Sequence, residues 1–395
     1  MTPAARVQAA IEVLDRIGQG AATEQALTAW ARGARYAGSK DRAAVRDHVF
    51  AAIRGRRSLA ALGGGEGGRA IMIGALREAG APLDDIFSGA PHAPAPLDAA
   101  ERAAGHPPEG AARVDLPDWL WPMFRASLGD AAEAVALALR ERAGVHLRVN
   151  VARTDRDGAI AALAADGVVA EPHPAADTAL TVTEGARRIR QARAYAEGMV
   201  ELQDAASQAL ARELPVSPGA KVLDYCAGGG GKALALAALG AGDGQGLLVA
   251  HDADPGRMRD LPERARRAGA RIRQATTAEL AGLAPFDLVL CDAPCSGSGS
   301  WRRAPDGKWA LTPDRLEELR RIQSGILDDA APLVADGGVL AYATCSVLRS
   351  ENDDQVADFQ RRHPGWTLQK ARNWPVSRGN FGTDGFHLSV LTRKT

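Results

Sequence analysis

Hydrophobic residues follow two different patterns along this chain. Between residues 5 and 60 they recur with a helical period, and Val45, Val49 and Ile53 are spaced to line one face of a helix. The glycine-rich stretch 63–68 ends that pattern. From residue 217 onward, short hydrophobic strands alternate with amphipathic helices. Such alternation predicts an α/β fold with a largely parallel sheet covered by helices on both faces.

The predicted elements divide the chain into four parts. Alternating residues at 146–153 predict a strand, and a helix over 155–167 follows it. The later predicted strands are 222–226, 246–252, 271–274, 286–292, 337–345 and 386–394, with the longest helix over 312–334. We therefore expect a helical domain at 1–75, a linker with helices at 76–145, a small α/β unit at 146–214 and a catalytic domain at 215–395.

Composition excludes several classes of protein. The chain has 395 residues, 46% of them hydrophobic, but no apolar run long enough to span a bilayer. Its N-terminus lacks the apolar core of a signal peptide, so a cytoplasmic location is expected. Four cysteines without a CxxC pair, together with eight scattered histidines, form neither a disulfide framework nor a structural zinc site. No metal and no membrane partner are expected.

Positive charge is concentrated locally although the formal net charge is zero. Residues 1–70 contain eleven Lys and Arg against six Asp and Glu, and a second cluster comprises Arg187, Arg188, Arg190 and Arg193. Local basic patches can bind nucleic-acid phosphates even in a neutral protein. Alternatively, arginine simply replaces lysine throughout, since the chain has only six lysines.

A glycine-rich loop at 224–232, DYCAGGGGK, joins a strand to a helix. Glycines let the backbone approach a ligand closely, and a helix N-terminus offers free N–H donors. The loop is not a P-loop, because alanine follows Lys232, and it is not GxGxxG. Asp252 ends the next strand, where an acid can accept hydrogen bonds from ribose hydroxyls, or can begin the helix near Pro255. This arrangement suits NAD and S-adenosylmethionine alike.

Two cysteines decide between these cofactors. Cys295 in DAPCSGSG (292–299) and Cys345 in ATCSV (343–347) each stand where a predicted strand ends. The carboxyl ends of parallel strands meet at one crevice, so both thiols should lie beside the glycine-rich loop. Hydride transfer needs no thiol. Methylation of a pyrimidine carbon through a covalent intermediate does, which favours S-adenosylmethionine.

The ordered motifs resemble the Nop/Sun family of RNA cytosine-5 methyltransferases. They are ELQDAAS (201–207), DYCAGGGGK, DAPCSGSG, RRAPDGKW (302–309), TCSVLRSEND (344–353) and TDGFH (383–387). The N-terminal part is similar to the bacterial branch that acts on small-subunit ribosomal RNA and carries a helical domain like NusB. The resemblance implies a Rossmann-like methyltransferase domain with a mostly parallel seven-stranded sheet, and 5-methylcytosine in 16S ribosomal RNA as the product. No oligomer is required, and a monomer is expected.

By resemblance, Cys345 is the nucleophile and Cys295 assists release of the product. Cys345 also precedes Ser350-Glu-Asn-Asp353, a capping-box-like helix start that would lower the pKa of a nearby thiol. Cys295 is the rival nucleophile, because Pro-Cys is the nucleophilic dipeptide of DNA cytosine-5 methyltransferases. Asp292 is expected to contact N3 and the amine of the base, and Lys232 to hold the base or Asp292 in position.

The cofactor is expected to touch the glycine-rich loop and the ends of the following strands. The residues concerned are Cys226, Ala227, Gly228, Gly229, Gly230, Gly231, Lys232, Asp252, Arg257, Thr276 and Asp292. Gly228 and Gly229 stand where the family usually has Ala and Pro, which predicts a more flexible loop. No acid follows the third strand until Glu279, so Thr276 or Thr277 would replace it. Cys226 and Cys291 are predicted to lie inside strands as small buried hydrophobes.

A basic segment after the Pro-Cys loop offers further contacts to RNA. Arg302, Arg303, Lys308 and Trp309 could grip phosphate or stack on a base, or form a surface loop with a packed tryptophan. The cluster Arg187–Arg193 and the basic face at Arg42–Arg57 could extend the track. Three alternatives stay open: methylation of transfer or other RNA, methylation of DNA or a small molecule, and an inactive RNA-binding assembly factor.

Overall fold

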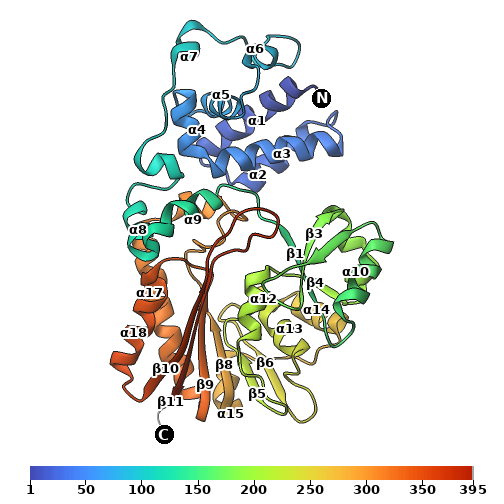
Figure 1. Cartoon of the computed structure of the whole chain (residues 1–395), viewed down its shortest axis with the longest axis vertical. Coiled ribbons are helices and arrows are strands. Elements are labelled where there is room, and N and C mark those ends of the chain that lie inside the picture. Colours follow the sequence, from blue (N-terminus) through green and yellow to red (C-terminus); the bar gives the residue numbers. More distant parts are fainter. Residues whose placement is uncertain (394–395) are drawn as a thin grey trace. The chain divides into compact units, whose positions relative to one another are not determined.

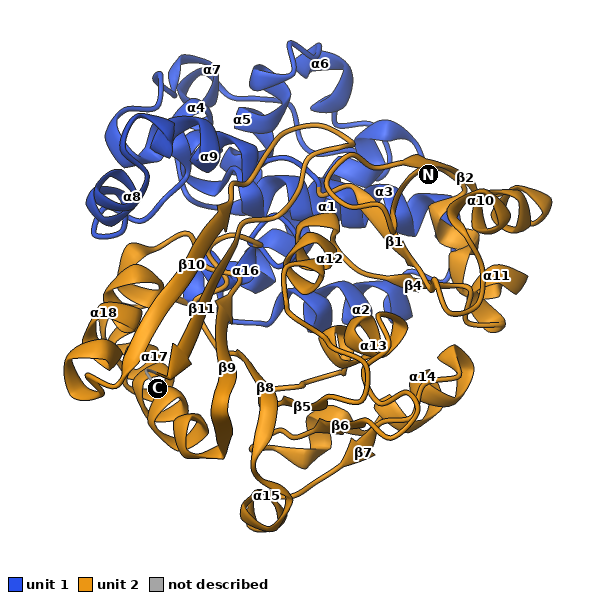
Figure 2. Ribbon diagram, turned by 60° about the horizontal axis from the view of Figure 1, so that its bottom comes forward, with its two compact units in different colours: residues 1–142, 301–310 blue, residues 143–300, 311–395 orange. Residues whose placement is uncertain are grey.

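The computed structural model describes residues 1–393 and groups the chain into two compact units (Figures 1 and 2). Unit 1 comprises residues 1–142 together with the short segment 301–310, and unit 2 comprises 143–300 and 311–395. The chain therefore leaves unit 2 after Ser300 and returns to it at Leu311. The four-part division made from the sequence stays a prediction.

Unit 1 is helical. Its helices are α1 (Pro3–Gly18), α2 (Thr23–Gly33), α3 (Ser39–Arg54), α4 (Arg56–Gly63), α5 (Gly68–Glu78), α6 (Leu83–Ile86), α7 (Ala99–Ala103), η1 (Gly110–Val114), α8 (Trp121–Leu128), η2 (Gly129–Ala131), α9 (Ala132–Ala138) and α16 (Asp306–Ala310). The helical face predicted at Val45, Val49 and Ile53 is buried in the core of this unit, against residues of α1, α2 and α5. The predicted helical N-terminal region is therefore confirmed.

Unit 2 begins with a small antiparallel sheet of strand order β2-β3-β1-β4. Its strands are β1 (Val145–Val149), β2 (Val169–Pro172), β3 (Ala179–Glu184) and β4 (Val200–Leu202), and its helices are α10 (Arg156–Ala165), η3 (Ala186–Gln191) and α11 (Arg193–Ala196). Leu147, Leu163 and Leu180 form part of a separate hydrophobic core. This is the small α/β unit that the alternating pattern after residue 146 predicts.

The second sheet of unit 2 has seven strands in the order β10-β11-β9-β8-β5-β6-β7. Its strands are β5 (Lys221–Asp224), β6 (Leu247–Ala250), β7 (Arg273–Gln274), β8 (Phe286–Asp292), β9 (Val334–Thr344), β10 (Trp366–Trp374) and β11 (Phe386–Arg393). The five strands from β9 to β7 are parallel, and β11 runs antiparallel to both of its neighbours, β9 and β10. The predicted mostly parallel, seven-stranded sheet is thus confirmed. Lys394, at the end of the last predicted strand, lies outside the described residues.

Helices cover both faces of this sheet (Figure 1). They are α12 (Ala205–Arg212), α13 (Gly231–Ala238), η4 (Pro255–Met258), α14 (Leu261–Ala268), α15 (Thr277–Leu283), α17 (Pro313–Ala330), η5 (Ala331–Leu333), η6 (Arg349–Glu351) and α18 (Asp353–Arg362). Alternate residues of β8 enter opposite cores: Val289 packs with α17 and α18, whereas Leu288 and Leu290 pack with α12 and α13. Burial on both faces explains why β8 reads as a continuous apolar run.

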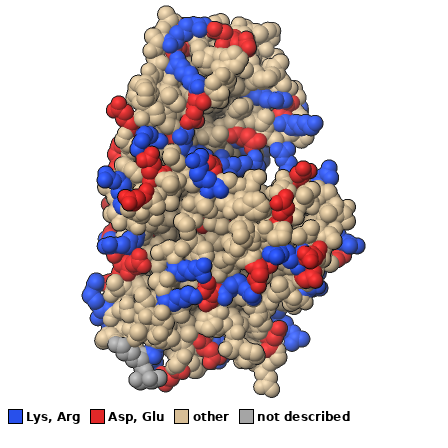
Figure 3. Space-filling model, in the orientation of Figure 1, with Lys and Arg blue, Asp and Glu red and all other residues tan. Residues whose placement is uncertain are grey.

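Charged residues of both signs are interspersed on the face shown in Figure 3, in keeping with the net charge of zero. Within residues 1–393, no helix is both long and apolar enough to cross a bilayer. The same part of the chain holds no group of three or more His, Cys, Asp or Glu side chains arranged to bind a metal ion.

Candidate active site

The two cysteines lie side by side at the ends of adjacent parallel strands. Cys345 directly follows β9, and Cys295 follows β8 by three residues. Their Sγ atoms are 3.4 Å apart, and both residues are partly buried. A main-chain hydrogen bond joins the two loops that carry these cysteines, since Gly299 N donates to the Cys345 carbonyl at 2.9 Å. A Cβ atom at Gly299 would lie 2.3 Å from the Gly385 carbonyl oxygen, so only glycine permits this approach.

The surroundings of the two thiols shift their pKa values in opposite directions. The hydrogen bond from Cys295, helped by the Lys232 ammonium, lowers the pKa of Cys345. The same hydrogen bond and burial raise the pKa of Cys295 well above its ordinary value. Of the two thiols, Cys345 is therefore the one that ionises more readily. A thiolate is the reactive form of cysteine.

A lysine–carboxylate pair borders the cysteines. Lys232 Nζ donates to Asp292 Oδ2 at 2.6 Å, and the lysine is 7% exposed. Burial favours the neutral amine, but the Asp292 carboxylate outweighs it and raises the pKa of Lys232. Lys232 Nζ also lies 5.2 Å from the centroid of the Phe386 ring. The ammonium is thus held charged between Asp292 and Cys345.

Asp224, the first residue of the glycine-rich motif, is a candidate site residue that the sequence alone does not indicate. It ends β5 and is fully buried, and neither carboxylate oxygen has a hydrogen-bond partner among the described residues. Burial, aided by the neighbouring Asp292, raises the pKa of Asp224 to about 7. A carboxylate that ends a central strand is the sequence signal that could have identified it.

The glycine-rich loop is anchored by side chains from elsewhere in unit 2. Gly228 N donates to Asp252 Oδ2 at 2.9 Å, Arg148 donates to the Gly231 carbonyl at 2.8 Å, and Arg264 donates to the Gly229 carbonyl. These bonds oppose the greater flexibility predicted for a loop lacking Ala and Pro. Arg148, on β1 of the small sheet, was not found from the sequence because its partner is 83 residues away.

Helix α13 begins at this loop with its N-terminus open. Gly230 is the N-cap, with φ +78°, and no described side chain caps the helix. A Cβ atom at Gly230 would lie 2.3 Å from Leu261 Cδ1. A helix N-terminus without a side-chain cap can receive an anionic ligand, as at other anion-binding helix ends.

Asp252 and Arg257 lie together beyond β6. Asp252 is 4% exposed and accepts hydrogen bonds from Gly228 N and from Asp254 N, the latter at 3.0 Å. Arg257 Nη1 lies 3.1 Å from Asp252 Oδ2. These contacts bring Asp252 against the loop that it was predicted to share with the cofactor. Its role toward a ribose stays a prediction.

The threonines after β7 already have partners. The Thr276 hydroxyl donates to Glu279 Oε2 at 2.8 Å within a capping box for α15, and Thr277 Oγ1 lies 2.9 Å from His251 Nε2. Glu279, in the first turn of α15, therefore lies beside Thr276, two residues after β7. The contact to adenine stays a prediction.

Two local predictions from the sequence are wrong. Ser350 does not cap a helix: its Oγ has no partner among the described residues, and the short 3-10 helix η6 precedes α18. The N-cap is Asn352, whose side chain instead bonds the Thr344 hydroxyl and the Ser346 carbonyl. Cys226 lies in the turn after β5 and is partly exposed, whereas Cys291 is buried in β8 as predicted.

The basic segment after the Pro-Cys loop is mostly internal to unit 1. Arg302 is 0% and Lys308 1% exposed. Lys308 Nζ donates to the Arg54 carbonyl at 3.0 Å, and Trp309 Nε1 donates to the Ile53 carbonyl at 2.8 Å. The hypothesis that Arg302 and Lys308 grip RNA phosphate is therefore wrong. Arg303 is exposed and is still compatible with it.

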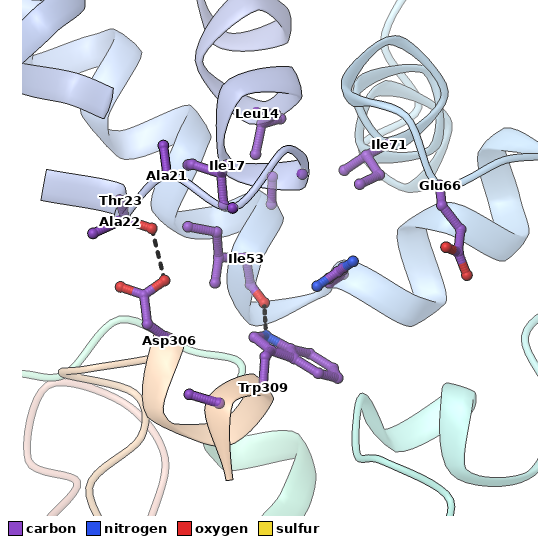
Figure 4. A pocket seen from close by; sticks show the side chains of 15 residues that line it. Leu14, Ile17, Ala21, Ala22, Thr23, Ile53, Glu66, Ile71, Asp306 and Trp309 are labelled. Carbon is purple, nitrogen blue, oxygen red and sulfur yellow. Dashed lines mark hydrogen bonds between the residues drawn. The ribbon is translucent and has the colours of Figure 1, made fainter. Parts of the chain in front are cut away.

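The segment borders a cleft of about 500 Å³ within unit 1 (Figure 4). Thr23 Oγ1 donates to Asp306 at 2.7 Å, and the Trp309 ring nitrogen donates to the Ile53 carbonyl (Figure 4). Two arginines of the predicted basic face form ion pairs with carboxylates of unit 1 at its surface. Arg46 pairs with Glu24, and Arg57 pairs with Asp118. By contrast, the cluster at 187–193 exposes all four of its arginines.

Lys308 should make the stability of the protein depend on pH. Burial lowers the pKa of Lys308 from 10.5 to about 7. Between these values the unfolded chain binds more protons than the folded one, so stability rises with pH across this window and the full cost is present below it. Lys308→Met should therefore stabilise the protein by roughly 2 to 4 kcal/mol at pH 6 and by less at pH 9.

Thermal and urea unfolding of both proteins at pH 6, 7.5 and 9 would check this. The exposed Lys40→Met serves as the matched control and should change nothing. An equal difference between wild type and Lys308→Met at all three pH values would contradict the prediction.

Comparisons with known proteins agree with the motifs. The family described as 16S rRNA methyltransferase RsmB/F matches residues 211–392, and its ferredoxin-like domain matches 116–187. The chain is 31% identical over 377 residues to the "Probable ribosomal RNA small subunit methyltransferase B" of Bacillus subtilis (strain 168), covering 90% of this chain and 78% of that protein. It is 36% identical over 296 residues to the "Ribosomal RNA small subunit methyltransferase B" of Citrobacter koseri, covering 72% and 68%.

Solved structures share the fold. The crystal structure of PH0851 superposes with a TM-score of 0.74 at 22% identity, covering 100% of this chain and 99% of that one. NSun6 from Pyrococcus horikoshii, solved with SFG, gives a TM-score of 0.62 at 19% identity, covering 71% and 98%. The family matches and the relatives at 31% and 36% identity confirm the predicted resemblance. The chain belongs to the RsmB/F family of ribosomal RNA methyltransferases.

Proposed function

We propose that this protein transfers a methyl group from S-adenosylmethionine to C5 of a cytosine in small-subunit ribosomal RNA. The observation that carries the proposal is the pair of thiols 3.4 Å apart beside the Lys232–Asp292 pair. A methyltransferase that acts on a nucleophilic oxygen or nitrogen has no use for two cysteines. The names of the relatives support ribosomal RNA as the substrate.

The first step is addition of Cys345 to the base. C5 of cytosine is a weak nucleophile. When the Cys345 thiolate forms a bond to C6, the C5–C6 π bond opens and the negative charge is shared between C5 and N3, so C5 becomes a nucleophilic, enamine-type carbon. Covalent catalysis of this kind divides one difficult step into easier ones. Asp292 accepts from the exocyclic amine and contacts N3, so it orients the base and disfavours uracil.

The residues around α13 are suited to hold the cofactor. Gly228–Gly231 present an uncapped helix N-terminus, and buried Asp252 and Asp224 lie at the ends of neighbouring strands. S-adenosylmethionine supplies an electrophilic methyl group. The Lys232 ammonium pairs with the Asp292 carboxylate and adds positive charge near Cys345.

Product release completes the cycle. After methylation, C5 loses its proton and the C6–Sγ bond breaks, so that the C5–C6 double bond re-forms and the Cys345 thiolate leaves. Cys295 is the thiol 3.4 Å from that leaving thiolate and aids release from the product as its hydrogen-bonding neighbour.

The test is transfer of labelled methyl from S-adenosylmethionine to total RNA from a strain lacking this protein, with the labelled nucleoside identified. Label in 5-methylcytidine of small-subunit ribosomal RNA is expected. Label in transfer RNA would keep the reaction and change the substrate. Absence of label despite cofactor binding would contradict the proposal and favour DNA, a small molecule or a binding-only role. Ribonuclease-sensitive, salt-dependent binding separates RNA from small substrates.

A further inference from the structure

A single buried carboxylate joins the two cysteine loops. Glu351 is 0% exposed. Its Oε1 accepts from Ser296 N at 2.8 Å, and its Oε2 accepts from the Ser296 and Ser346 hydroxyls, each at 2.5 Å. Ser296 follows Cys295, and Ser346 follows Cys345. The same side chain thus holds the residue after each thiol.

The donors that reach this carboxylate are neutral. Besides the two serines, Gln323 of α17 donates to Glu351 Oε1 at 3.0 Å and to the Pro294 carbonyl at 3.0 Å. Tyr342 of β9 donates to the Glu351 main-chain carbonyl at 2.7 Å. Hydrogen bonds from neutral groups stabilise a buried carboxylate without cancelling its charge. Among the described residues, Glu351 therefore combines a rigid attachment with a negative charge that no ion pair neutralises.

We propose that Glu351 is a positioning residue that decides which thiol keeps the shared proton, holding it on Cys295 and leaving Cys345 as the nucleophile. The inference deepens the proposed function and rests on it for the roles of the two cysteines. The charge opposes ionisation of Cys295, whose loop Glu351 grips by both a main-chain and a side-chain donor. On the other side, Cys345 faces the Lys232 ammonium, which favours its thiolate.

The electrostatics agree with this geometry. After the hydrogen bond to Cys345 and burial, the Glu351 charge is among the causes that raise the pKa of Cys295. The pKa of Cys345 is lowered, chiefly by the hydrogen bond from Cys295. Two adjacent thiols that would otherwise compete for one proton are thus separated by fixed charges of opposite sign, Lys232 and Glu351.

The test measures which cysteine reacts first. The full-length protein is treated with limiting iodoacetamide at a single pH of 8, and the alkylation rates of Cys345 and Cys295 are measured separately by peptide mass spectrometry. In the wild type, Cys345 should react faster. Glu351→Gln keeps the length of the side chain and one acceptor oxygen but removes the charge. It should lower the Cys345 to Cys295 rate ratio about tenfold or more.

Two further variants separate charge from structure. Glu351→Asp keeps the charge and should preserve the preference for Cys345 even if the methylation rate falls. Glu318→Gln, an exposed carboxylate of α17 paired with Arg315, is the matched control and should leave the ratio unchanged. If Glu351→Gln does not fold, as judged by circular dichroism, a loss of preference in Glu351→Asp overturns the proposal.

A purely structural role gives a different result. Methylation would then fall in Glu351→Gln while the alkylation ratio stayed at the wild-type value, which would overturn the proposal. The readout does not depend on the substrate. If the wild type methylates no RNA but Glu351→Gln still changes the ratio, the proposed function fails and the role of Glu351 stands.

Discussion

Replacement of Cys345 by alanine should abolish methyl transfer, with a loss of at least about 10⁴-fold in the single-turnover rate. Without the thiolate, C5 of cytosine is not activated, and no other described side chain can replace it except Cys295, whose pKa is raised. Binding of S-adenosylmethionine and of RNA should be close to that of the wild type. The loss therefore lies in the chemical step.

Single-turnover assays with labelled cofactor, together with a binding titration for the cofactor, would measure this. Cys291→Ala provides a matched control, because Cys291 is a free cysteine buried inside β8, before the loop that carries Cys295. Full activity of Cys345→Ala, combined with loss of covalent adduct in Cys295→Ala, would show that the two roles are inverted.

Replacement of Cys295 by alanine should trap the protein on its RNA. Addition to C6 needs only Cys345, but breaking the C6–Sγ bond is slowed when the neighbouring thiol is gone. The expected result is an adduct that survives denaturing electrophoresis and accumulates toward one equivalent of RNA per protein. Turnover should drop to a single cycle or less.

The adduct can be checked by its dependence on the nucleophile. The double variant Cys295→Ala with Cys345→Ala should form none, and ribonuclease should reduce the adduct to a protein carrying a short oligonucleotide. If Cys295→Ala turns over as fast as the wild type without an adduct, Cys295 has no part in release.

The sequence was most informative where strands end. A parallel sheet brings the carboxyl ends of its strands to one edge, so the motifs at 224–232, 292–299 and 343–347 could be assigned to one crevice without coordinates. The apolar strands themselves predicted the sheet, because burial on both faces demands continuous hydrophobic runs. The roles of the residues in that crevice came from the family resemblance and stay predictions.

Contacts between distant segments could not be predicted. Lys308 reads as a surface cation, yet its partner is a carbonyl 254 residues earlier in the chain. Ser350 matches a capping pattern, but an extra 3-10 turn and the engagement of Asn352 by the Cys345 loop moved the helix start to Asp353. Glu351 belongs to the same motif, but its contacts with both cysteine loops could not be predicted, because they depend on the fold.

The discontinuity of unit 1 has a consequence for synthesis on the ribosome. Its core includes Trp309, and its last segment, 301–310, is translated after most of unit 2. The helical unit can begin to fold as it emerges, but it is completed only when nearly 160 further residues have followed. A fragment ending at residue 142 would lack that segment, and a fragment beginning at 143 would carry a buried lysine and arginine without their surroundings. The two units are therefore poor candidates for separate exchange between proteins.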